Sequence, residues 1–167
     1  MKRKTRKGTF ETNSSSVHNI VISRKAVDRT KIPGSLHFCG DEFGWEIESY
    51  ADPASKASYL FVALLDRSDR DSLVETIKNT LAEHGCIATF EEIKEDSWDN
   101  GYIDHSGSLG DFVDVVVNDK NMLLSYLFGN SIVFTANDNM DWEDNPYAEE
   151  IDSYENDGDY VAFYKGN

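Results

Sequence analysis

Carboxylates alternate with aromatic rings between residues 138 and 159, and this segment contains no Lys or Arg. Carboxylates spaced along a surface can stand in for phosphates and occupy the basic groove of a nucleic-acid-binding protein. Aromatic rings between them can stack on arginine or fill a partner's pockets. We therefore expect the partner-binding residues to be Asp138, Asp141, Trp142, Glu143, Asp144, Tyr147, Glu149, Glu150, Asp152, Tyr154, Glu155, Asp157 and Asp159. The ordinary alternative is a solvated surface that keeps the protein soluble.

A second acidic stretch covers residues 91–119, where Lys94 is the sole basic residue. We expect it to add to the same binding function, with a solvated surface again as the alternative. Its acidic members are Glu91, Glu92, Glu95, Asp96, Asp99, Asp104, Asp111, Asp114 and Asp119.

Two patterns suggest a metal-binding regulatory module as an alternative. Asn137, Asn139 and Asp141 alternate as in the first half of a calcium-binding EF-hand loop, but Trp142 stands where that loop needs glycine. Two His-x-Cys pairs offer zinc ligand types, although their spacing matches no common zinc module. These pairs are His37 with Cys39 and His84 with Cys86. Buried cysteines and core histidines explain the pairs more simply, so we expect no metal and no cofactor.

Serine, histidine and aspartate also occur close together in sequence, which suggests a small hydrolase or transferase. The candidates are Ser14 to Ser16 with His18, and Asp104 with His105 and Ser106. Catalytic triads meet in space rather than in series, and neither group comes with a recognisable orienting acid or oxyanion hole. Neither a phosphate-binding glycine loop nor a zinc-protease HExxH motif is present. We therefore expect a binding protein with no catalytic residue.

The charge distribution narrows the class of partner. Residues 1–31 hold nine of the 16 Lys and Arg residues but two of the 31 Asp and Glu residues, which makes this segment +7. Residues 32–167 hold seven basic and 29 acidic side chains, a net charge of −22. Such a field repels nucleic acid and membrane surfaces and attracts basic proteins. We expect residues 1–7 to form a flexible basic arm.

The elements that would position these groups follow from hydrophobic patterning and turn residues. We expect a single acidic α+β (mixed α/β) domain over residues 8–167, with three to four helices and a small mixed or antiparallel sheet. Asp52 before Pro53, and Asp119 before an apolar run, are helix starts, and Gly85 is a helix stop. The expected helices cover 53–66, 69–84, 108–117 and 120–128, although the β-branched run within 108–117 also permits a strand there. The expected strands cover 17–23, 36–39, 45–47, 86–90, 102–103, 131–136 and 160–164. Of these, 36–39 and 45–47 are expected to form a hairpin, and 138–159 is expected to be an acidic loop or extension.

Residues 7–18, KGTFETNSSSVH, resemble the start of a group of small proteins from bacteriophages and other bacterial mobile elements. The resemblance covers about a dozen of 167 residues and assigns no activity. It implies a phage context, in which small acidic proteins often inhibit host restriction or CRISPR effectors. With two cysteines and no apolar export signal, we expect the cytoplasm of a bacterial host cell. A structural phage component is a further alternative.

Overall fold

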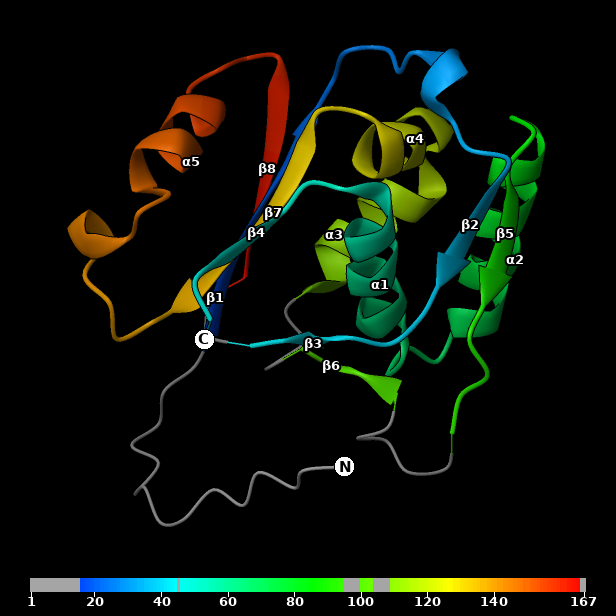
Figure 1. The fold of residues 1–167 in the computed structure, drawn as a ribbon, viewed down its shortest axis with the longest axis horizontal. Helices are drawn as coiled ribbons and strands as arrows, with labels where there is room; N and C mark the ends of the chain where they lie inside the picture. The colour runs from blue at the N-terminus through cyan, green and yellow to red at the C-terminus, as the bar shows by residue number, and fades with distance from the viewer. Residues whose placement is uncertain (1–15, 45, 95–99, 104–108, 166–167) are drawn as a thin grey trace.

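A four-stranded antiparallel sheet forms the centre of the computed structural model, which describes residues 16–44, 46–94, 100–103 and 109–165 (Figure 1). The strand order is β4-β7-β1-β8. Ile20 at the middle of β1 pairs with Val133 of β7 on one side and with Phe163 of β8 on the other. The strands are β1 Ser16–Ser23, β4 Glu48–Tyr50, β7 Ser131–Asn137 and β8 Tyr160–Lys165.

Helices cover both faces of this sheet. Side chains alternate along β1, so Ile20 and Ile22 join the main core while Val21 packs on the opposite face. Burial on both faces explains why β1 is almost completely buried and carries three consecutive β-branched residues, Ile20 to Ile22. On the main-core side lie α1 Pro53–Leu64, α3 Gly110–Asn118 and α4 Lys120–Phe128, and on the other side lies α5 Ala148–Glu155 (Figure 1).

Two short parallel strand pairs extend the fold beyond α1. β2 pairs with β5, and β3 pairs with β6. The expected hairpin of 36–39 with 45–47 is wrong, because β2 pairs with a strand that follows α1 and α2. Phe38 stacks on Phe90 of β5 with ring centroids 4.5 Å apart, so this pairing buries the apolar face. The bounds are β2 Ser35–Phe38, β3 Glu42–Phe43, β5 Ile87–Phe90, β6 Tyr102–Ile103 and α2 Arg70–Ala82.

The predicted helix boundaries are confirmed where they rest on capping residues. The Asp52 carboxylate accepts a hydrogen bond from the Ser55 amide at 2.9 Å at the start of α1. Asp119 accepts from the Asn121 amide at 2.8 Å at the start of α4. Gly85 follows α2 with a φ of 76°, which is the left-handed conformation that glycine adopts at low cost. Ser108, the expected cap of α3, lies outside the described residues.

The α+β fold class is confirmed, with one α-helix more in the described ranges than expected. The segment expected as an acidic loop contains a 3-10 helix, η4 Trp142–Asp144, and the helix α5. Another 3-10 helix, η1, covers Arg29–Lys31. Within the described ranges, no helix is both long and apolar enough to cross a lipid bilayer.

Helix α1 carries a buried lysine, Lys56. The Lys56 ammonium of α1 donates to the Gly129 carbonyl at 3.3 Å and to the Ser131 carbonyl and hydroxyl at 3.2 and 3.0 Å. The residue is 1% exposed, and desolvation lowers the pKa of Lys56 from 10.5 to about 8. Lys56 therefore ties α1 to the turn between α4 and β7 while paying a desolvation cost.

This lysine predicts a pH-dependent stability. Between pH 8 and 10.5 the unfolded chain binds more protons than the folded one, so the free energy of unfolding rises with pH in this window. The buried Cys86 thiol, whose pKa is raised by burial, opposes this rise in the same window. We therefore expect Lys56 to contribute a gain of about 2 kcal/mol between pH 7 and 9.5, measured in urea unfolding as the difference between the wild type and Lys56→Met. Above pH 10 the trend reverses, because burial raises the pKa of Tyr59 and Tyr126. Lys56→Met should flatten the rise, and an equal rise in this variant would contradict the assignment.

Candidate partner-binding face

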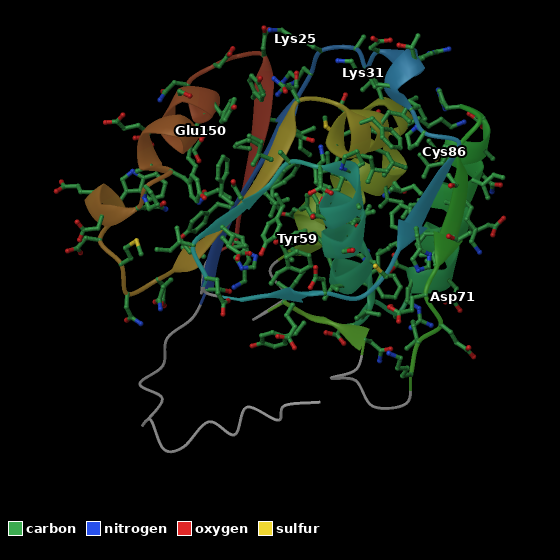
Figure 2. The ribbon with its side chains drawn as sticks, in the orientation of Figure 1. Lys25, Lys31, Tyr59, Asp71, Cys86 and Glu150 are labelled. Atoms are coloured by element: carbon green, nitrogen blue, oxygen red, sulfur yellow. The ribbon has the colours of Figure 1, made fainter. Side chains whose placement is uncertain are left out.

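The segment between β7 and β8 presents a row of exposed carboxylates. It leaves the sheet after Asn137, forms η4 and α5, and returns at Tyr160. Glu150 lies on α5, the helix at the left of Figure 2. We call the exposed carboxylates of this segment, Asp159 excepted, the acidic face: Asp141, Glu143, Asp144, Glu149, Glu150, Asp152, Glu155 and Asp157.

A small apolar cluster fixes the acidic face to the sheet. Ile151 of α5 is fully buried against Val21 and Phe134. The Tyr147 ring packs on Phe134 with centroids 5.3 Å apart, and the Tyr154 ring packs on the Tyr160 ring at 4.7 Å. Two of the three aromatic residues expected to contact a partner therefore help to hold α5 in place.

The acidic face carries charge that the described part of the chain does not neutralise. None of its eight carboxylates forms an ion pair with a described residue. Asp159, at the end of the segment, pairs with Lys25 at 2.9 Å, and this hydrogen bond raises the pKa of Lys25. Asp138, at its start, has a partner and is half-buried. Carboxylates this close together, without ion pairs to the described residues, produce a negative local potential.

The second acidic stretch uses three of its described carboxylates within the fold, whereas Glu92 and Asp111 are exposed. Glu91 accepts a hydrogen bond from the Gly40 amide at 2.9 Å, which lowers the pKa of Glu91. Asp114 pairs with Arg67 at 2.7 Å, and Asp119 caps α4. Glu91 shares a cavity wall with Asp71, which Figure 2 places on the opposite side of the molecule from Glu150. Glu95, Asp96, Asp99 and Asp104 lie outside the described residues. The stretch therefore does not extend the acidic face.

A cavity of about 210 Å³ opens beside the acidic face. Trp142 and Tyr164 both line it, and they are 42% and 65% exposed. Sequence reasoning missed Tyr164, although alternation along β8 puts it on the same side of the sheet as Tyr160. The cavity is lined by Val17, Ala136, Asn137, Asp138, Met140, Trp142, Asn145 and Tyr164.

His18, a candidate for catalysis, belongs to a buried polar row. Its ring nitrogens lie 2.8 Å from the Tyr59 hydroxyl and 3.2 Å from the Gly44 carbonyl. Strand register places His18 beside Thr135 of β7 and Lys165 of β8. All three side chains are at most 1% exposed, so they belong to the interior of the described structure. Ser14, Ser15, Asp104, His105 and Ser106 lie outside the described residues.

The histidines and cysteines considered as zinc ligands lie in separate environments within the fold. His37 contacts the Thr89 hydroxyl at 2.9 Å, and Cys39 contacts the Ser58 hydroxyl at 3.4 Å. His84 contacts the Thr80 carbonyl at 2.9 Å at the end of α2, and Cys86 is fully buried. Across the described ranges, no three His, Cys, Asp or Glu side chains come together as a metal site would require.

The fold and this site define an α+β protein that holds an acidic face on one side of its central sheet. No protein-family model, no curated protein and no solved structure matches the chain.

Proposed function

We propose that this protein is a phage-type inhibitor that binds a basic nucleic-acid-binding protein of a bacterial host, a restriction or CRISPR effector. The acidic face occupies the groove that the effector uses for nucleic acid. The inhibitor acts in the host cytoplasm, where such effectors meet phage nucleic acid. It works by occlusion and carries out no chemical step.

The observation that supports this proposal is that the eight exposed carboxylates of the acidic face lie on a segment packed against the central sheet. Free carboxylates on a flexible loop lose conformational entropy when they bind, which weakens the complex. Here Ile151 and the rings of Tyr147 and Tyr154 already fix α5 on the sheet. A preorganised acidic face meets a basic groove without that cost, and its potential speeds association.

The mechanism is competition for the same basic side chains. A groove that binds nucleic acid neutralises phosphates with Lys and Arg and releases counterions. Carboxylates on the acidic face can contact the same Lys and Arg residues. Binding of the inhibitor and binding of nucleic acid then exclude each other, and both weaken as salt rises.

A pull-down from bacterial lysate tests the proposal. The tagged protein is incubated with nuclease-treated lysate and washed in steps of rising salt, and each eluate is analysed by mass spectrometry. We expect a basic nucleic-acid-binding protein in a mid-salt step, released when duplex DNA or RNA is added in excess. Recovery of no such protein by folded bait, or a captured protein that nucleic acid does not displace, would contradict the proposal.

A further inference from the structure

The cavity beside the acidic face lies next to the part of the sheet that α5 covers. α5 and β1 have eight residues each, which correspond to about 12 Å of helix and about 26 Å of strand. α5 covers the part of the sheet around Val21 and Phe134. Val17 and Ala136, which pair with each other nearer the end of the sheet, are left as cavity lining beside the η4 segment.

The cavity walls present aromatic and apolar groups to solvent. Trp142 comes from η4 and Tyr164 from β8, and both remain substantially exposed. Met140 adds a polarisable thioether beside them. Exposed aromatic groups that line a hollow typically mark an interaction site. A volume of about 210 Å³ is below the roughly 300–1,000 Å³ of small-molecule pockets, which favours a single side chain as the occupant.

The charge around the cavity selects a cation. Among the described residues, its lining includes Asp138, which also has a partner of its own, and neither Lys nor Arg. Asp141, Glu143 and Asp144 surround Trp142 in the chain and belong to the acidic face. A cation that enters this hollow meets aromatic lining residues and nearby carboxylates together. Arginine suits such walls better than lysine, because its planar and weakly hydrated guanidinium stacks on aromatic rings.

We infer that this cavity receives an arginine side chain of the basic partner, between Trp142 and Tyr164. The inference rests on the proposed function and specifies how the acidic face recognises its partner. The carboxylates supply long-range attraction to any basic surface, whereas the cavity distinguishes arginine from lysine. The partner's groove should therefore present at least one arginine opposite η4.

Two peptides of equal length and charge, hexa-arginine and hexalysine, separate these contributions. Affinity is measured by calorimetry at fixed ionic strength, and the indole resonance of Trp142 is followed by NMR. A cation–π contact of about 1–2 kcal/mol corresponds to a preference of about 5- to 30-fold for hexa-arginine. We expect Trp142→Leu and Tyr164→Ser to remove this preference and leave hexalysine affinity unchanged. Tyr164 is 65% exposed, so its replacement should leave the fold intact.

A matched control is Ile87→Ser, which changes a 67% exposed side chain on β5, away from the cavity, and should preserve the preference. Equal affinity for both peptides, or a preference that survives both cavity variants, would overturn the inference. Charge-dependent capture of a host protein from lysate would then still support the proposed function. If no host protein is captured but the arginine preference is intact, the cavity binds arginine and the proposed inhibitor function is contradicted.

Discussion

Replacing Asp141, Glu143 and Asp144 together by lysine weakens binding to the captured partner by about 10- to 100-fold and reduces its salt dependence. Each exposed ion pair contributes about 0.2–1 kcal/mol, and reversal converts attraction into repulsion of similar size. Fewer released counterions also flatten the dependence of affinity on salt. Affinity is measured by calorimetry at several salt concentrations.

The fold should tolerate this variant. Asp141 precedes η4 but makes no side-chain cap hydrogen bond, and all three carboxylates are exposed. The matched control is Glu42→Lys with Glu75→Lys and Glu92→Lys, which changes the net charge equally at exposed positions outside the acidic face. If both triple variants bind equally, net charge alone governs binding and the acidic face has no specific role.

Ile151→Ala detaches α5 from the sheet and, with it, the acidic face. Ile151 is the large apolar side chain by which α5 enters its small cluster, and truncating a buried isoleucine costs about 2–5 kcal/mol. This cluster is separate from the main core, so we expect local opening of α5 while the rest of the fold persists. Hydrogen exchange followed by mass spectrometry should show faster exchange over residues 148–155 than over α1, and weaker partner binding.

Ile77→Ala is the control for this experiment. Ile77 is also fully buried, but it lies on α2 in the main core. The same truncation there should destabilise the main core without selectively opening α5. Unchanged exchange over residues 148–155 in the Ile151 variant would mean that other contacts hold α5. Loss of α5 protection with full binding would show that the acidic face needs no fixed frame.

Local signals in the sequence were sufficient for most individual elements. Asp52, Asp119 and Gly85 mark helix ends because capping depends on a side chain or a φ angle within a few residues. The run from Val17 to Ser23 identifies β1, because β-branched residues suit a strand buried on both faces. α5 was missed, because Ala148 and Ile151 are its buried residues and offer too little periodicity.

For the candidate site, too, the sequence predicts the charge but not the geometry. Net charge and the absence of basic residues between 138 and 159 follow from composition, so an acidic surface was predictable. Its geometry was not: Tyr147 and Tyr154 turn towards the sheet, whereas Trp142 stays exposed beside Tyr164. Asp114 and Asp119 are used within the fold, as an ion pair and a cap.

The sequence by itself determined the fold class, the main helices and strands, and the negative charge, because each depends on composition or on neighbours within a few residues. The tertiary structure decided which strands pair, which carboxylates remain unpaired and where an aromatic cavity forms. β2 pairs with β5, and Trp142 and Tyr164 line the same cavity, across long stretches of intervening chain. Such contacts depend on how separate elements bury their apolar faces together, which no local pattern records.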